Sequence, residues 1–168
     1  MKKERKPRPS PDSFTGIVPA PFGAVGFKTD GEMVTGVSFM PGHTIGKTPA
    51  DAFAREVARQ LAAYLADAAF LPDFPVVDAG TDFQRKVWRE MRKIPVGKAR
   101  TYGDVAGSIG SGPRAVGGAC AANPLVLYYP CHRIVAAGGI GGFSGETAPD
   151  NGFLRIKQWL LRHEGFLR

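Results

Sequence analysis

The pattern of apolar and polar positions divides the first half of the chain into strands followed by one helix. Residues 14 to about 39 favour strands, and the runs 22–28 and 33–39 flank Asp30-Gly31, a pair typical of hairpin turns. Thr48 can cap a helix with Pro49 at its first position. Apolar residues then recur at helical spacing, at Phe53, Val57, Leu61, Tyr64, Leu65 and Ala68. We therefore predict a small α/β scaffold domain over residues 14–75.

The second half of the chain has the pattern of short helices and follows a linker that contains Pro72, Pro75 and Gly80. Thr81 and Gln84 have the spacing of a capping box. The helix that they begin would bury Phe83, Val87, Trp88, Met91 and Ile94. A last helix, from about 151 to 163, would turn Phe153, Ile156, Trp159 and Leu160 to the core and leave Arg155, Lys157 and Arg162 in solvent.

Between these two helices the sequence predicts a compact pair. Thr101 is a candidate cap for the first helix, the turn 110–112 ends it, and a second helix runs from 113 to about 122. Two short helices joined by a glycine turn suggest a helix-turn-helix. Gly117 and Gly118 are unfavourable inside a helix by about 1 kcal/mol each relative to alanine. They make sense where another helix or a DNA groove approaches the backbone closely, with Arg114 as the only long side chain.

Composition and charge narrow the class of protein. The net charge of +7 and a pI near 9.7 favour anionic partners, nucleic acid first. Much of this charge lies in Arg85, Lys86, Arg89, Arg92, Lys93, Lys98, Arg100 and Arg114. Residues 1–13 read as a disordered basic tail without an export signal, and no apolar run could span a membrane. We expect a cytoplasmic protein, associated with the nucleoid in a bacterium, whose two cysteines stay reduced and bind no metal.

The candidate chemistry lies around Cys131. The apolar run 125–129 between two prolines predicts a short buried strand or extended segment that ends at Pro130, and a glycine-rich loop follows from residue 138. A cysteine nucleophile needs a base or a cation to become a thiolate. His132 is the candidate base, but neighbouring side chains on an extended chain point to opposite sides. A bridging water or a local turn would be needed, and Glu164 is the best candidate to orient His132.

Several ordered motifs carry a family resemblance. Pro-Cys-His-Arg at 130–133, Arg-Ala-Val-Gly at 114–117, Asn-Pro at 123–124, Thr-Tyr-Gly-Asp at 101–104 and Gly-Thr-Asp-Phe-Gln at 80–84 resemble the O6-alkylguanine-DNA alkyltransferases. The resemblance is strong over residues 80–168 and weak before them. It implies a ribonuclease-H-like α/β N-terminal domain, followed over residues 76–168 by a mostly α domain with a winged or helix-turn-helix type of DNA-binding motif.

The resemblance also implies a role for each site residue. Cys131 would accept an alkyl group from guanine O6, and also from O4-alkylthymine, once in the life of the protein. His132 would act through water as base, Glu164 would hold it, and Tyr102 would assist the leaving guanine. Arg114 would fill the gap left by the flipped base. Asn123, Ile134 and Ser144 would help to hold the guanine or brace its pocket. Contacts to the minor groove of double-stranded DNA would come from Thr101, Ala115, Gly117, Gly118 and Ala121.

Within this family no cofactor is expected, and the protein would act as a monomer. The rivals are a Cys-His-Glu hydrolase, a non-catalytic protein that binds lesions, and a transcription regulator. Two departures from the family pattern are the short turn at 110–112 and the additional segment 146–152. We expect that segment to form a surface loop directed away from the duplex.

Overall fold

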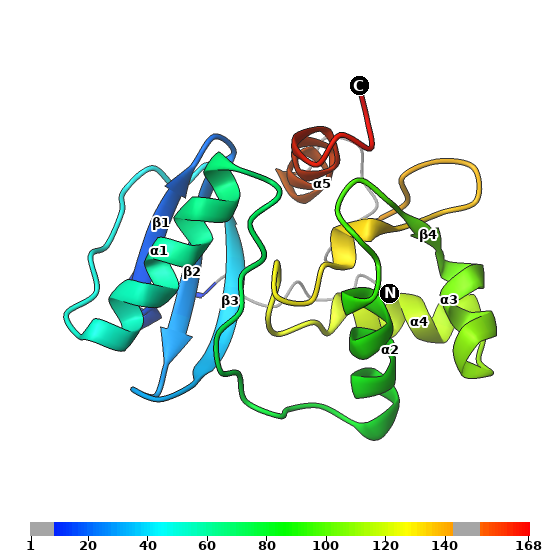
Figure 1. Ribbon diagram of the computed structural model, residues 1–168, viewed down its shortest axis with the longest axis horizontal. Coiled ribbons are helices and arrows are strands. Elements are labelled where there is room, and N and C mark those ends of the chain that lie inside the picture. The colour runs from blue at the N-terminus through cyan, green and yellow to red at the C-terminus, as the bar shows by residue number, and fades with distance from the viewer. Residues whose placement is uncertain (1–8, 143–151) are drawn as a thin grey trace, which may run out of the picture.

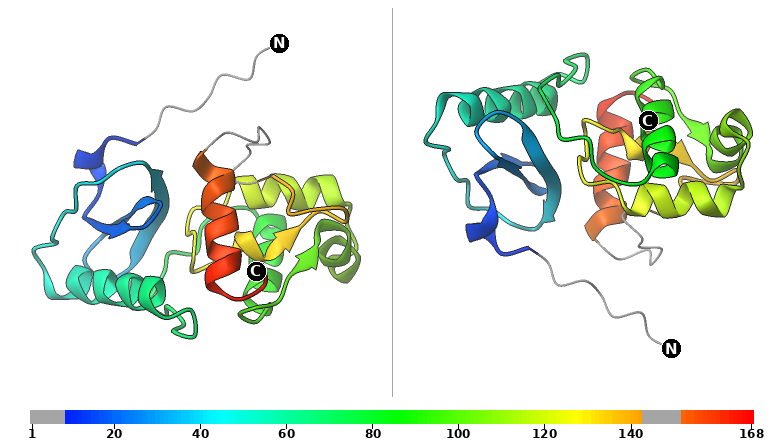
Figure 2. Two further views of the ribbon diagram at one scale, coloured as in Figure 1. Left: turned by 90° about the horizontal axis from the view of Figure 1, so that it is seen from above. Right: turned by 90° about the horizontal axis from the view of Figure 1, so that it is seen from below.

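The computed structural model describes residues 9–142 and 152–168. Three antiparallel strands, β1 (Gly16–Ala20), β2 (Gly23–Thr29) and β3 (Val34–Pro41), form a sheet in the order β1-β2-β3. Helix α1 (Ala52–Ala66) packs on this sheet. Helices α2 (Asp82–Arg92), α3 (Tyr102–Ile109) and α4 (Pro113–Ala121) form the other side of the molecule, and α5 (Gly152–His163) lies between the two groups (Figures 1 and 2).

The hairpin is confirmed, but the start of α1 is later than predicted. Strands β2 and β3 pair across the Asp30-Gly31 turn. Thr48 does not cap α1; the side chain of Asp51 accepts the backbone N–H of Ala54 at 2.8 Å and is the N-cap. The reason is that Lys47 exchanges two backbone hydrogen bonds with Ile17, both of 3.0 Å. The chain is therefore held beside β1 at Lys47, and α1 begins only after Asp51.

The predicted caps of the later helices are confirmed. Thr81 and Gln84 form a reciprocal capping box on α2, and Thr101 caps α3, where Asp104 completes a second box. Gly110, at the end of α3, has a φ of 66°, a left-handed conformation that glycine adopts readily. The indole of Trp88 donates a hydrogen bond of 2.9 Å to the carbonyl of Ala119, which joins α2 to α4.

A short parallel pair of strands was not predicted. Strand β4 (Arg100–Thr101) pairs with β5 (Ile134–Val135), with Arg100 opposite Ile134 and Thr101 opposite Val135. Each strand has only two residues, too few to show a periodic pattern. The pairing brings the start of α3 beside the segment that follows Cys131.

The predicted orientation of α5 is wrong at Lys157. The buried residues of the helix are Leu154, Ile156, Lys157, Leu160 and Leu161, whereas Phe153 and Trp159 are only partly buried. Lys157 has no exposed surface, and its ammonium donates to the carbonyls of Ile134 at 2.7 Å and Gly142 at 3.0 Å. A buried lysine is tolerated when its charge has such partners.

One hydrophobic core connects the sheet to the helices. It runs from Val25 and Phe27 in β2 through Leu61 of α1 and Leu160 of α5 to Met91 of α2. The hydrophobic core is therefore continuous across the predicted domain boundary between residues 75 and 76. Among the described residues no helix is long and apolar enough to cross a membrane.

Candidate active site

The segment before Cys131 is a tight turn, so the predicted buried strand or extended segment at 125–129 is wrong. The carbonyl of Pro124 accepts from Val37 at 2.9 Å, and then the chain reverses, with the N–H of Tyr129 bonded to the carbonyl of Leu125 at 2.9 Å. Leu127 adopts a φ of 70°, which is uncommon for a residue other than glycine. A run of apolar residues does not distinguish such a buried turn from a buried strand.

Cys131 itself begins a short 3-10 helix, Cys131–Arg133. This is the local turn that the sequence left open as one way to bring Cys131 and His132 into one site. Asn123 braces the turn from the end of α4. Its Nδ2 donates to the carbonyl of Tyr129 at 2.8 Å, and its Oδ1 accepts the N–H of Leu125 at 2.9 Å. The side chain of Asn123 thus makes two hydrogen bonds at the corner that it was predicted to brace.

Glu164 is the centre of a buried polar network. Its Oε2 accepts from Nε2 of His132 at 2.9 Å, from a terminal nitrogen of Arg133 at 2.9 Å and from the hydroxyl of Tyr64 at 2.7 Å. Its Oε1 accepts from Nε of Arg133 at 2.8 Å. Arg133 also donates to the carbonyl of Ile94 at 2.7 Å. Glu164 therefore lies where the sequence expected it, and Tyr64 and Arg133 complete a set that the sequence did not predict.

The electrostatics of this network keep His132 neutral. Burial lowers the pKa of His132 below its usual value, against the opposing effect of Glu164. Burial alone would raise the pKa of Glu164, but hydrogen bonds from His132 and Arg133 hold it well below its usual range. Because an ionised carboxylate can only accept, Nε2 of His132 carries the ring proton. Its Nδ1 is then unprotonated and able to take up a proton.

The surroundings of Cys131 favour the thiol over the thiolate. Burial raises the pKa of its thiol, although Asn123, the charge of Lys157 and the N–H groups of Cys131 and His132 act to lower it. Burial lowers the pKa of Lys157 to about 8. A thiol in this setting needs a base to react as a nucleophile, and neutral His132 is the adjacent one.

Tyr102 faces the same region from α3. Its hydroxyl donates to the carbonyl of Gly142 at 3.4 Å, and the ammonium of Lys157 lies 5.8 Å from the centre of its ring. Burial, followed by the neighbouring thiols of Cys120 and Cys131, raises the pKa of Tyr102 to about 12. Gly141 has a φ of 75°, and a Cβ there would lie 3.2 Å from the Tyr102 ring. The glycine thus permits a close approach. Ser144 and the segment 146–151 lie outside the described residues.

Helix α4 presents small residues outward. Arg114, Ala115, Gly118 and Ala121 are exposed and Gly117 is half-buried. A Cβ added at Gly117 or Gly118 would meet nothing within 4 Å, apart from the helix's own backbone. Within the described residues, therefore, the two glycines do not serve close packing against another helix. Thr101 is half-buried, and its hydroxyl is engaged in the cap of α3.

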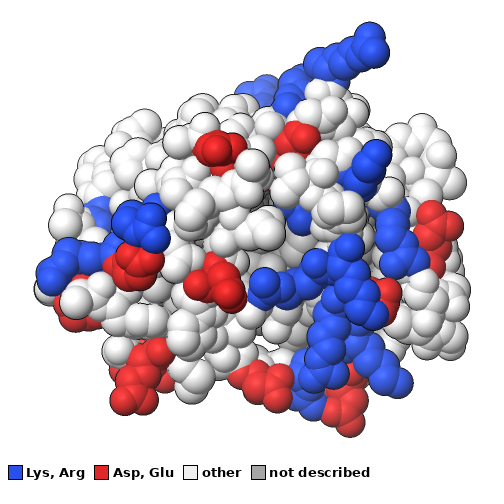
Figure 3. Space-filling model, in the orientation of Figure 1, with Lys and Arg blue, Asp and Glu red and all other residues white. Residues whose placement is uncertain are grey.

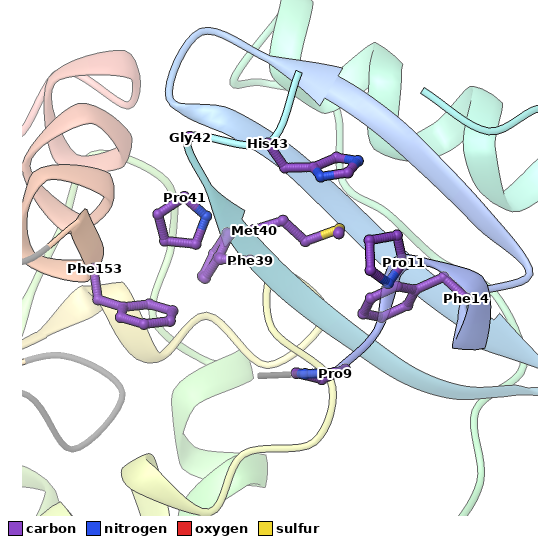
Figure 4. Close-up of a pocket in the computed structure, with 9 residues that line it drawn as sticks. All are labelled: Pro9, Pro11, Phe14, Phe39, Met40, Pro41, Gly42, His43 and Phe153. Carbon is purple, nitrogen blue, oxygen red and sulfur yellow. The ribbon is translucent and has the colours of Figure 1, made fainter. Parts of the chain in front are cut away.

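Basic side chains gather over α2 on the face shown in Figure 3. Lys86, Arg89 and Arg92 on α2 and Lys93 directly after it are exposed, and the guanidinium of Arg92 lies 3.8 Å from the centre of the Tyr128 ring. A separate apolar hollow of about 370 Å³ lies between β3 and the start of α5 (Figure 4). Phe14, Met40, His43 and Phe153 line it, and it contains none of the predicted site residues. No group of His, Cys, Asp or Glu side chains among residues 9–142 and 152–168 could hold a metal ion.

Comparisons with known proteins agree with this fold and identify the family. Residues 82–166 match the family model of the DNA-binding domain of 6-O-methylguanine DNA methyltransferase. The methylated-DNA–protein-cysteine methyltransferase of Methanosarcina acetivorans is 36% identical over 90% of this chain and 98% of its own length. The crystal structure of the Mycobacterium tuberculosis O6-methylguanine methyltransferase is 33% identical, with a TM-score of 0.69 over 88% of this chain and 90% of that one.

A second structure of the Mycobacterium tuberculosis protein, in complex with DNA, is 30% identical with a TM-score of 0.68 over 88% of this chain and 90% of that one. The chain belongs to the methylated-DNA–protein-cysteine methyltransferase family. The resemblance found in the sequence motifs is confirmed, and so is the expected combination of a small sheet with helices.

Proposed function

We propose that this protein repairs alkylated DNA by transferring the alkyl group from O6 of guanine, and also from O4 of thymine, to its own Cys131. The observation that carries the proposal is a buried thiol beside a neutral histidine that is held by a carboxylate at 2.9 Å. A relative with the same fold forms a complex with DNA, which supports DNA as the partner.

In the proposed reaction, the polar groups of the site act one after another. The thiol proton passes through a water molecule to Nδ1 of His132, while Nε2 stays bonded to Glu164. The thiolate sulfur then attacks the alkyl carbon, so that a carbon–sulfur bond forms and the carbon–oxygen bond to guanine breaks. Tyr102 donates a hydrogen bond to the guanine anion that leaves. This anion takes up one proton, which balances the proton that the thiol gave to His132. The product is a thioether that none of these groups can hydrolyse, so each chain acts once and no cofactor takes part.

The proposed DNA-binding surface is the outer face of α4. We infer that α3 and α4 act as a helix-turn-helix whose second helix lies in the minor groove, where Ala115, Gly117, Gly118 and Ala121 let the backbone come close. Arg114 fills the gap when the damaged nucleotide turns outward, since a stacked base cannot reach the thiol. Thr101 contacts the backbone nearby. Asn123, Ile134 and Ser144 support the guanine.

The proposed architecture follows the family. Residues 14–75 form a ribonuclease-H-like scaffold domain, and residues 76–168 form the DNA-binding and transfer domain. The protein acts as a monomer in the cytoplasm, on the nucleoid if the cell is bacterial.

Intact-mass spectrometry tests this proposal directly. After incubation with duplex DNA that contains O6-methylguanine, the protein should gain one methyl group in place of a hydrogen, located on the peptide that contains Cys131. Cys120→Ser is the matched control and should still gain it, whereas Cys131→Ser should not. Several turnovers per chain would indicate a hydrolase, and DNA binding without a mass change would indicate a protein that only recognises lesions. Either result would overturn the proposal.

A further inference from the structure

Tyr64 connects α1 to the centre of the active-site network. It lies in the last turn of α1 and is 2% exposed, and its hydroxyl donates to Oε2 of Glu164 at 2.7 Å. The two residues are 100 positions apart in the sequence. A second contact fixes the same place, because Nε2 of His163 lies 2.7 Å from the backbone carbonyl of Tyr64 and the two rings meet edge to face at 5.4 Å.

The hydroxyl of Tyr64 shares its acceptor with His132. Both groups bond to Oε2 of Glu164, and Arg133 donates to the same oxygen. A carboxylate oxygen that accepts more hydrogen bonds is a weaker base, because each donor stabilises the ionised form. Glu164 therefore draws the Nε2 proton of His132 less strongly than it would without Tyr64. Burial and the charge of Glu164 raise the pKa of Tyr64, so its hydroxyl remains a donor at neutral pH.

We propose that Tyr64 is a positioning residue of the transfer reaction, through which α1 orients the Glu164 carboxylate and keeps His132 neutral and ready to accept a proton. This inference rests on the proposed function and deepens it, because it assigns the N-terminal half of the chain a part in the reactivity of Cys131. Tyr64 touches neither the thiol nor the substrate in this assignment. It acts only through Glu164.

The other charged groups around His132 come from two elements. Arg133 lies beside it on the 3-10 helix, and Lys157 and Glu164 approach from α5 and the residues after it; both cations disfavour a charged imidazole. His163 bonds to the backbone of Tyr64. None of these groups is altered by Tyr64→Phe, which removes one hydroxyl and keeps the ring. The variant therefore isolates the hydrogen bond to Glu164.

The sign of the effect follows from the shared oxygen. Without the hydroxyl, Glu164 is more basic and stabilises the protonated form of His132, so the pKa of His132 rises. His132 can then accept the proton of the Cys131 thiol only at higher pH. A hydrogen bond to a charged group corresponds to a shift of about one pH unit, or about tenfold in rate on the acidic limb.

The experiment measures the reaction of Cys131 with free O6-benzylguanine as a function of pH, in the full-length protein. We expect the acidic limb of the rate profile to move by about one unit to higher pH in Tyr64→Phe, with about a tenfold lower rate below it. Tyr128→Phe, which removes a hydroxyl outside the Glu164 network, is the matched control and should keep the profile of the wild type. A purely structural role would lower the melting temperature and leave the limb in place, and that result would overturn the inference.

A second measurement separates this inference from the proposed function. The imidazole of His132 can be titrated by NMR in isotope-labelled protein that has met no substrate. We expect a higher pKa of His132 in Tyr64→Phe than in the wild type and in Tyr128→Phe. An unchanged titration would refute the role of Tyr64 even if Cys131 is alkylated normally. If wild-type Cys131 is never alkylated, the proposed function fails, and the titration still decides how Tyr64 acts on His132.

Discussion

Replacing Glu164 by glutamine should destabilise the protein strongly while keeping the shape of the side chain. The carboxylate accepts four hydrogen bonds, from Tyr64, His132 and two nitrogens of Arg133. An amide can keep its oxygen at the Oε2 position, but its NH₂ group then faces Nε of Arg133, donor against donor. The buried guanidinium also loses its counter-charge.

The magnitude can be estimated from the burial of the pair. The side chain of Glu164 is 1% exposed and that of Arg133 is 8% exposed. Removing one partner of a buried ion pair destabilises a protein by about 3–5 kcal/mol. That is a large part of a total stability on the order of 5–15 kcal/mol. We therefore expect the melting temperature of Glu164→Gln to fall by roughly 10 °C.

Urea unfolding followed by circular dichroism measures this change, with Glu56→Gln as the control. Glu56 pairs with Arg59 on the surface of α1 at 2.6 Å, and both side chains are largely exposed, so that variant should unfold like the wild type. The reasoning is refuted if Glu164→Gln loses less than about 1 kcal/mol, which is the range of a solvated surface pair.

The difference in stability between the wild type and Glu164→Gln also depends on pH. The folded protein holds the pKa of Glu164 below its ordinary value of 4.5. Its contribution to stability is therefore fully present above the pKa of the unfolded chain and is lost as the pH falls below it. The difference in stability between the wild type and Glu164→Gln should shrink in acid and stay constant near neutrality.

Two further predictions concern Arg114 and Lys157. Arg114→Ala should slow repair of duplex DNA far more than the reaction with free O6-benzylguanine, because only the duplex requires a flipped base; equal losses in both rate assays would place Arg114 in the fold or the pocket. The pKa of Lys157 is lowered from 10.5 to about 8, so the unfolded chain binds more protons between these values. As the pH rises from about 8 to about 10.5, the free energy of unfolding of the wild type should therefore increase by up to about 3 kcal/mol relative to that of Lys157→Met. If the difference in unfolding free energy between the two proteins stays constant over this range, Lys157 is not buried as a charged group.

The features that the sequence predicted correctly depend on residues a few positions apart. The Asp30-Gly31 hairpin, the capping box at Thr81 and the helix cap at Thr101 rest on local backbone geometry, and each is formed. Glu164 was named as the best candidate to orient His132, and the family resemblance implied the same pairing. Its geometry could not have been derived, because 32 residues separate the two.

The predictions that failed concern side chains whose hydrogen-bond partners lie far away in the sequence. Lys157 was assigned to solvent because it is charged, but hydrogen bonds to the distant carbonyls of Ile134 and Gly142 help to make its burial tolerable. Tyr64 was one apolar position in a helical stripe. A signal was present, since a buried tyrosine usually has a hydrogen-bond partner for its hydroxyl, but nothing local could name a glutamate 100 residues later.

The long separation between Tyr64 and Glu164 has a consequence for protein synthesis. A ribosome makes a chain from its N-terminus, and the sheet and α1 exist well before α5 has been translated. Between the synthesis of Cys131 and that of Glu164, the chain contains the thiol but not the carboxylate that holds His132. A nascent chain therefore carries an unassisted thiol. Under the proposed mechanism, reactivity toward alkylated bases arises only when α5 has emerged and docked between the two groups of elements, so translation would delay the single use of the cysteine.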